Sequence, residues 1–168
     1  MIRLGAAVIL VGLLAAAPGP ESRPAETQPA REHVVIAGEL FRLELAADAR
    51  TRARGLGGRD KVPDDGGMLF VFPDTRNRSF WMKDCLVDID LMFLDSRGRI
   101  VALHRMKTEL PRGAEESIRA YEGRLKLYAS TRPTRIAIEL KTGSIDRLKL
   151  DTGQLIKLDL VRLKKKAR

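Results

Sequence analysis

The segment IDLMFLDSRGRIVAL, residues 89–103, gives the clearest indication of the fold. Its first part, Ile89–Leu94, is an apolar run in which Asp90 is the single charged residue. A short polar turn that ends at Gly98 separates this run from a second apolar one, and glycine readily adopts the positive φ that short hairpin loops need. The segment therefore predicts a β-hairpin whose first strand lies at the centre of a sheet and is covered on both sides.

Other segments predict further strands around this hairpin. Met68–Phe72 is a second continuously apolar run, and we expect it at the centre of the sheet as well. Elsewhere the apolar residues alternate with polar ones at a period of two, which is the pattern of a half-buried strand. The alternating segments are residues 41–45, 124–128, 136–140 and 156–160.

Helix signals are few. Asp48 can cap a short helix that runs through Arg54 and stops at Gly55, and a second short helix is expected between Thr142 and Leu150. Residues 107–120 lack an apolar rhythm and are expected to form a long surface loop. Many short strands with two short helices predict a mainly β fold, either a jelly-roll-like sandwich or a partly open barrel.

The ends of the chain differ in composition from its middle. Residues 1–17 combine a positive start with an apolar run and are expected to be a secretory signal peptide, followed by a flexible linker over 18–33 that is rich in proline and charge. A single β-rich domain is expected over 34–163 and a basic tail over 164–168. The protein should therefore be exported to the periplasm or outside the cell, or retained by an uncleaved anchor, because Pro18 follows the cleavage motif.

The net charge of +9 is concentrated at the C-terminal end. Five of the last seven residues are basic, namely Arg162, Lys164, Lys165, Lys166 and Arg168. Such a tail on an exported protein can make weak contact with an anionic membrane or polymer, or it can simply be solvated. Because the rest of the chain is only mildly basic, nucleic acid is not an expected partner.

A cationic aromatic segment, Arg78–Lys83, is the clearest binding signal. It combines two aromatic rings, a thioether and two positive charges, which suits an anionic or ring-shaped ligand. On an extended strand Trp81 and Lys83 share one face. The alternative is that Trp81 forms a wall of the sandwich while Lys83 is solvated.

Three other charged residues complete the candidate ligand-binding set. Arg54 lies beside Gly55, Glu139 is flanked by apolar residues, and Asp90 lies in the central apolar run. Arg54 and Glu139 also fit a structural ion pair that fixes packing rather than performs chemistry. The candidate set is Arg54, Arg78, Trp81, Lys83, Asp90 and Glu139.

Residues typical of catalysis are sparse. Asp88 and Asp90 share a strand face and His104 is the one plausible catalytic imidazole, so a hydrolase or transferase that uses Asp88, Asp90, Glu139 or His104 is the enzymatic alternative. The single cysteine, Cys85, excludes a disulfide within the chain and is expected to be a buried thiol.

A soft-metal site is a further alternative for the sulfur-containing residues. Its conceivable ligands are Met68, Met82, Met92, Met106, Cys85 and His104. These residues lack the close spacing of known metal motifs, and scattered methionines usually fill a core. Neither a metal nor another cofactor is expected.

Several segments, in the same order, resemble the bacterial and archaeal family called domain of unknown function 192. They are its Arg-x-x-Gly-Leu motif at residues 52–56, its GMLFVF strand at 67–72, its aromatic-Trp-Met-Lys signature at 79–83, its hairpin at 90–101 and its C-terminal end at 139–153. The resemblance spans about residues 39–161. It implies a compact, mainly β domain of jelly-roll or barrel type, often behind a signal peptide, and it implies no known activity.

The chain departs from the family pattern at a few positions. Asp84 and Cys85 stand where the family commonly has Asn-Thr, Gly57 replaces a frequent methionine, and Gln154 replaces an acid. Taken together, the sequence favours a noncatalytic module of the cell envelope that binds an unknown small molecule or an envelope protein. The alternatives are the envelope hydrolase or transferase and a structural partner of another envelope protein.

Overall fold

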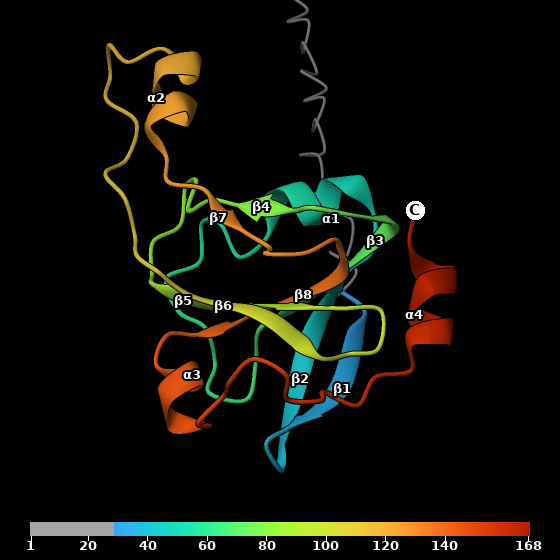
Figure 1. Cartoon of the computed structure of the whole chain (residues 1–168). Coiled ribbons are helices and arrows are strands. Elements are labelled where there is room, and N and C mark those ends of the chain that lie inside the picture. The colour runs from blue at the N-terminus through green and yellow to red at the C-terminus, as the bar shows by residue number, and fades with distance from the viewer. Residues whose placement is uncertain (1–28) are drawn as a thin grey trace, which may run out of the picture.

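The computed structural model describes residues 29–168, which form an open six-stranded sheet, a two-stranded ribbon and four short helices (Figure 1). All neighbouring strands of the sheet are antiparallel except β2 and β3, which are parallel. In spatial order the strands are β1 (Arg31–Ile36), β2 (Glu39–Ala46), β3 (Met68–Arg76), β8 (Thr134–Lys141), β5 (Ile89–Leu94) and β6 (Ile100–Met106). The mainly β class is confirmed.

The centre of the sheet is buried on both faces. Every residue of β5 and the first four of β3 are buried, as the two continuous apolar runs predicted. One face, which we call the helix face, packs Leu69, Met92 and Ile138 against α3 (Ser144–Arg147) and α4 (Leu160–Lys166). The opposite face, the ribbon face, is covered by α1 (Ala49–Arg54) and by the ribbon of β4 (Ser79–Phe80) and β7 (Tyr128–Ala129) (Figure 1).

The predicted β5–β6 hairpin is confirmed, and its turn shows why glycine is needed there. The Asp95 carboxylate accepts the backbone N–H groups of Arg97 and Arg99 at 2.8 and 2.9 Å. Gly98 has a φ of +83°, and a Cβ at this position would lie 2.6 Å from the carbonyl oxygen of Ile156. The turn therefore requires both a positive φ and the absence of a side chain.

Both predicted helices form. Asp48 caps α1 by accepting the Thr51 N–H at 2.9 Å, and Gly55, with a φ of +53°, ends the helix. The second helix, α3, is a single turn within the predicted range 142–150. The structure adds two helices that the pattern did not predict, α2 (Ile118–Arg124) and α4.

The strand predicted over residues 124–128 is wrong. Arg124 ends α2, Leu127 is 61% exposed, and only Tyr128 continues into the two-residue strand β7. The predicted loop over 107–120 likewise contains the start of α2 and forms an arm that projects from the sheet (Figure 1). A few alternating apolar and polar residues therefore do not distinguish a strand from an irregular segment whose conformation is fixed by contacts with distant residues.

The strand predicted over residues 156–160 is also wrong. Leu155 makes one isolated bridge with Arg99, and Ile156 is buried in the core of the helix face. Helix α4 then begins at Leu160, where Asp159 caps it by accepting the Arg162 N–H at 2.9 Å. The helix cap at Asp159 therefore decides the local structure, and the alternation of apolar and polar residues over 156–160 does not.

The domain extends further at both ends than the sequence predicted. Strand β1 begins at Arg31, inside the expected linker, and the carboxylate of buried Glu32 pairs with Arg162 at 2.5 Å and Lys166 at 2.7 Å. Much of the expected basic tail is thus helical and docked, and the Arg168 N–H donates to the carbonyl of Ala47. The expected signal peptide and most of the linker lie outside the described residues.

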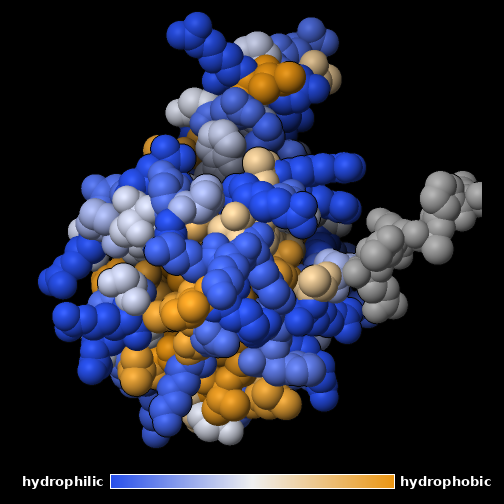
Figure 2. Space-filling model, turned by 90° about the vertical axis from the view of Figure 1, so that its right-hand side faces the viewer, coloured by the Kyte–Doolittle hydropathy of each residue, from blue (hydrophilic) through white to orange (hydrophobic). Residues whose placement is uncertain are grey.

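The surface on the side of α4 divides into two zones (Figure 2). Hydrophilic side chains cover most of it, and apolar surface gathers at the lower end, toward the β1–β2 turn (Figure 2). The β1–β2 hairpin exposes Val35 and Leu40, which face each other in register. Within residues 29–168, no helix is both long enough and apolar enough to cross a bilayer.

Candidate functional site

A cavity of about 330 Å³ lies on the ribbon face of the sheet, between α1, β4 and β8. Four of the six predicted site residues line it: Arg54, Trp81, Lys83 and Glu139. A second hollow, also lined by Arg54, Trp81 and Lys83, adjoins it and extends it toward solvent. We call the first hollow the Glu139 cavity.

The wall of the Glu139 cavity is aromatic. The Phe80 ring lies edge-on to the Phe70 ring at a centroid distance of 4.9 Å and to the Phe72 ring at 6.3 Å. Edge-to-face packing of this kind holds rings in fixed orientations. Sequence reasoning did not assign Phe70, Phe72 or Phe80 to the site, although Phe70 and Phe72 belong to the conspicuous GMLFVF strand.

Trp81 and Lys83 line the cavity and Met82 between them does not, although strand β4 ends at Phe80 and Lys83 begins a turn. Met82 is buried in the ribbon-face core, while Trp81 is 38% exposed at the cavity. The Lys83 ammonium lies 5.8 Å from the centroid of the Trp81 ring and 2.5 Å from the carboxylate of Glu122. Trp81 thus forms a wall of the cavity, and Lys83 is held at its edge rather than left in solvent.

Glu139 forms the buried end of the cavity. Its side chain is 4% exposed, and Oε2 has no hydrogen-bond partner. Burial raises the pKa of the carboxyl to about 8, although hydrogen bonding from the Leu56 backbone and the positive charge of Arg59 oppose this rise. At neutral pH the carboxyl is therefore mainly protonated and can donate a hydrogen bond.

The predicted ion pair between Arg54 and Glu139 is wrong. The residue beside the Glu139 carboxyl is instead Gly55, where a Cβ would lie 3.6 Å from Glu139 Oε2. Arg54 is exposed and has no ion pair or side-chain hydrogen bond among residues 29–168. Arg59, the cation that does act on Glu139, is paired with Glu44 at 2.6 Å.

Cys85 lies in the same cavity and is partly buried. Burial, together with the negative groups of Glu139 and Asp84, raises the pKa of the thiol to about 12. The thiol therefore stays protonated at neutral pH and is a poor nucleophile.

Residues 32–158 match the sequence profile of DUF192, a family described as "Uncharacterized ACR". The chain belongs to the DUF192 family. No curated protein matches this DUF192 chain.

Two crystal structures have a similar fold. One is a candidate transcription regulator from Sinorhizobium meliloti 1021, with 28% identity and a TM-score of 0.63 over 79% of this chain and 97% of its own. The other is a protein of unknown function from Novosphingobium aromaticivorans DSM 12444, with 22% identity and a TM-score of 0.64 over 86% of this chain and 94% of its own. The second likeness shows the fold alone.

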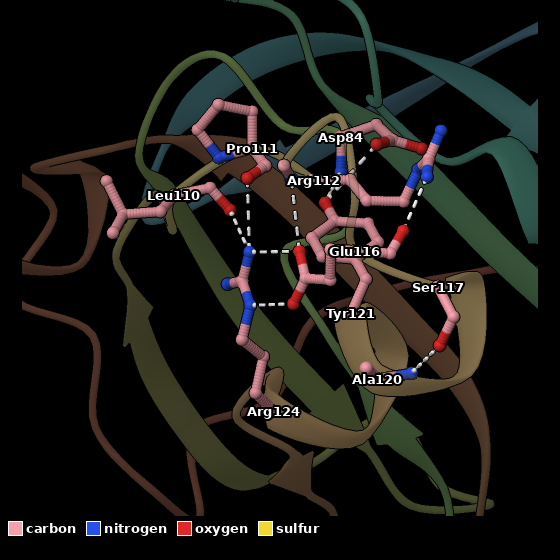
Figure 3. Close-up of polar contacts among 10 residues, drawn as sticks. Asp84, Leu110, Pro111, Arg112, Glu116, Ser117, Ala120, Tyr121 and Arg124 are labelled. Carbon is pink, nitrogen blue, oxygen red and sulfur yellow. Dashed lines mark hydrogen bonds and ion pairs between the residues drawn. The ribbon is translucent and has the colours of Figure 1, made fainter.

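The α2 arm of this DUF192 chain is tied to the edge of the cavity. The Tyr121 hydroxyl donates to the Asp84 carboxylate at 3.2 Å and accepts the Asp84 N–H at 3.1 Å (Figure 3). Within the arm, Arg124 bonds the Glu116 carboxylate and the carbonyl of Leu110 (Figure 3). Asp84, one of the departures from the family pattern, therefore anchors the arm beside Lys83.

Arg78 lies behind the aromatic wall rather than in the cavity. Its guanidinium stacks over the Phe72 ring at 4.0 Å and pairs with Asp74, while its backbone N–H donates to Ser130 Oγ at 2.9 Å. The side chain is buried. Its predicted place on the contact surface with Trp81 is therefore corrected to a supporting place behind Phe72.

Asp90 lies on the helix face, on the other side of the sheet from the cavity. Its Oδ2 accepts the backbone N–H of Ile145 at 2.8 Å, at the start of α3. Burial raises its pKa, and hydrogen bonding from the Ile145 backbone opposes this rise. Asp90 thus caps α3 from another element, while its Oδ1 has no hydrogen-bond partner among residues 29–168, and it does not lie with the predicted ligand residues that line the Glu139 cavity.

The residues of the enzymatic alternative are dispersed. Asp88 binds Lys107 and the Thr108 N–H, both at 2.8 Å, and lines a different cavity from Glu139. His104 Nε2 lies 2.8 Å from the carbonyl oxygen of Ala129. With Asp90 on the opposite face, these groups do not converge on a common point.

A larger cavity, of about 550 Å³, lies on the other side of Leu56. Two charge pairs in its wall are matched, Arg42 with Asp65 and Arg59 with Glu44, and the other charged residues there, Arg31, Asp60 and Lys61, are exposed to solvent. Within the described chain, no group of three His, Cys, Asp or Glu side chains is arranged to hold a metal ion. The Glu139 cavity differs from this larger one by combining an aromatic wall with a buried carboxyl oxygen that has no hydrogen-bond partner.

Proposed function

We propose that this chain is a noncatalytic module of the cell envelope that binds a small molecule in the Glu139 cavity. The observation that carries the proposal is a buried carboxyl whose Oε2 atom has no hydrogen-bond partner in the described part of the chain, in the wall of an aromatic-lined hollow. Such a group costs free energy unless a ligand or water satisfies it. A cavity of about 330 Å³ is at the small end of the range for small-molecule sites.

The protonation states support binding rather than turnover. Glu139 is the carboxyl and Cys85 the thiol of the cavity, and burial raises their pKa values to about 8 and about 12, respectively. A general base or a nucleophile needs the deprotonated form. Both groups are better suited to hydrogen bonding with a ligand.

The envelope location rests on the signal-peptide pattern of residues 1–17. The description of the S. meliloti relative suggests a regulatory role for that protein. For this chain, nucleic acid is not part of the proposal, because two cations of the basic C-terminal end, Arg162 and Lys166, are paired with Glu32. Mass spectrometry of the exported protein distinguishes release from retention by an anchor, because an intact Met1 would contradict release.

Trp81 provides the test of the binding site, because it is the only tryptophan of the chain and gives a single indole N–H signal in NMR spectra. We would titrate the protein with benzoate, naphthalene-2-carboxylate, indole-3-acetate and the corresponding amides. The blocking variant is Ala53→Phe, since Ala53 is exposed on α1 and lines the cavity. The matched control is Ala49→Phe on the same helix, outside the cavity.

We expect at least one probe to shift the indole signal in a saturable way, Ala53→Phe to abolish the effect and Ala49→Phe to leave it. A folded protein that binds none of the probes, or equal binding by the two variants, would contradict the proposal. Failure of every probe would instead favour the role of structural partner to another envelope protein.

A further inference from the structure

The two ends of the Glu139 cavity differ in chemistry. The buried end presents the Oε2 atom of Glu139 without a partner, and the outer end presents the unpaired cation Arg54. Aromatic rings line the space between them. A ligand that fills the cavity therefore meets three different surfaces in a fixed order.

We propose that the ligand is a planar aromatic anion that carries a hydrogen-bond acceptor at the end opposite its negative charge. The acceptor meets Glu139, the ring lies against Phe72, Phe80 and Trp81, and the anionic group meets Arg54. This inference rests on the proposed binding function and adds the chemical class and the orientation of the ligand.

An acceptor is required at the buried end because the carboxyl there is held in its neutral form. A neutral carboxyl has one O–H donor, and a ligand C–H group opposite it would leave that donor unsatisfied in a dry site. A cationic ligand could in principle pair with ionised Glu139. However, Arg52, Arg54 and Lys83 line the same cavity and repel such a ligand.

Arg54 is the cation that is free to receive the anion. Arg52 already donates to the carbonyl oxygens of Val71 and Arg168, at 3.0 and 2.8 Å. Lys83 is held by the Glu122 carboxylate at 2.5 Å. Within residues 29–168, Arg54 lacks such a bond while it lines both the cavity and the hollow that extends it.

A flat ring suits the space between the two ends. Phe80 holds its neighbours edge-on, so the wall offers a fixed combination of ring faces and ring edges. Trp81 is partly exposed and already has the Lys83 ammonium near its ring. An aromatic ligand gains stacking from these rings with little loss of conformational entropy.

The probes are quinoline-6-carboxylate and naphthalene-2-carboxylate, which differ in one ring atom far from the carboxylate. Quinoline has a nitrogen acceptor where naphthalene has C–H. At pH 6.5 we expect the full-length protein to bind the quinoline about tenfold more tightly, because the naphthalene leaves the Glu139 donor unsatisfied. The dissociation constants are measured by the indole signal of Trp81 and by calorimetry.

Two substitutions separate hydrogen bonding from shape. Glu139→Leu should remove the preference for quinoline, whereas Glu139→Gln should keep it because the amide can still donate. In the wild type the preference should fall as the pH rises above about 8, since ionised Glu139 accepts but cannot donate. Arg59 and Cys85 are the other titratable groups that interact electrostatically with Glu139. Neither changes its charge near pH 8, because Arg59 stays positive and Cys85 stays protonated.

The outer end is tested with quinoline-6-carboxamide. Arg54→Ala should reduce the preference for carboxylate over carboxamide about threefold, and Arg50→Ala, an exposed cation of α1 outside the cavity, should not.

Equal affinity for quinoline and naphthalene in the wild type would overturn the inference while leaving the proposed function standing, provided that Ala53→Phe still blocks both probes. A preference that survives Glu139→Leu, or one that rises above pH 8, would overturn it as well. If neither probe binds the cavity at all, both the inference and the proposed function fail.

Discussion

The buried carboxyls of Glu139 and Asp90 lie on neighbouring central strands but have different surroundings. Glu139 of β8 pairs in register with Leu91, and Asp90 of β5 pairs with Leu140, so the two acids point to opposite faces of the sheet. Burial raises the pKa of both. Within residues 29–168, each acid also has one oxygen without a hydrogen-bond partner, Oδ1 of Asp90 and Oε2 of Glu139. Asp90 faces the N-terminus of α3 and accepts the Ile145 N–H through Oδ2, whereas Glu139 lines an aromatic cavity. The comparison teaches that neither burial nor an unpaired oxygen marks a functional acid by itself, and that a place in the wall of a cavity distinguishes Glu139 from Asp90.

The largest expected effect is on the pH dependence of stability. The folded-state pKa of Glu139 is about 8 against 4.5 in the unfolded chain, so folding retains its proton and stability from this group is lost as the pH rises through 8. The free energy of unfolding of Glu139→Gln, relative to wild type, should rise between pH 5 and pH 9 by at most about 5 kcal/mol. Urea unfolding across this range measures it, and a constant difference would contradict a buried, unpaired Glu139.

The next effect concerns Cys85, which shares the cavity with Glu139. Since its thiol pKa is about 12, the folded protein at pH 8 should react with a disulfide reagent about 100-fold or more slowly than the urea-unfolded chain. Stopped-flow absorbance with an aromatic disulfide measures both rates. Comparable rates would mean that the cavity does not desolvate the groups within it.

A smaller effect is expected for the structural acid. Asp90→Ala leaves the Ile145 N–H without its acceptor and should cost about 1–3 kcal/mol of stability at pH 7. Probe binding to the Glu139 cavity should not change, because Asp90 lies on the other face. A loss of probe affinity in a folded Asp90→Ala protein would break the division between the two acids.

The smallest effect is expected at the exposed edge of the cavity. Glu122→Gln removes the partner of Lys83, a pair that is about one-third exposed on each side, and should cost less than about 1 kcal/mol. The freed Lys83 should strengthen binding of anionic probes about twofold, as the indole signal of Trp81 would report. Weaker binding would show that the α2 arm itself supports the ligand.

The sequence predicted the centre of the fold because its signals are local. The apolar runs 68–72 and 89–94 require cover on both sides, and Asp48 and Gly98 set a cap and a turn within a few residues. The failures at 124–128 and 156–160 have a tertiary cause. In the first, Arg124 is bonded to main chain more than ten residues away, which no local period reveals.

The site was predicted in part for a similar reason. Trp81 and Lys83 alternate within one segment, so their shared face follows from the sequence. The face of Asp90 relative to Glu139 depends on how β5 and β8 pair, and the sequence does not state that register. Gly55 also lies beside Glu139, where a Cβ would be 3.6 Å from Oε2, but the sequence pattern marks Gly55 only as the end of a helix.

The most direct test of the account is ¹³C NMR of the glutamate side-chain carboxyls, titrated with pH in the presence and absence of quinoline-6-carboxylate. We expect the Glu139 carboxyl to titrate near pH 8 in the free protein and at a higher pH with the probe bound, because the probe favours the protonated form. The Asp90 carboxyl, labelled in parallel, should not respond to the probe. A Glu139 midpoint near its ordinary value of 4.5, or one that the bound probe leaves unmoved, would contradict the claim that this carboxyl is the buried end of a binding site.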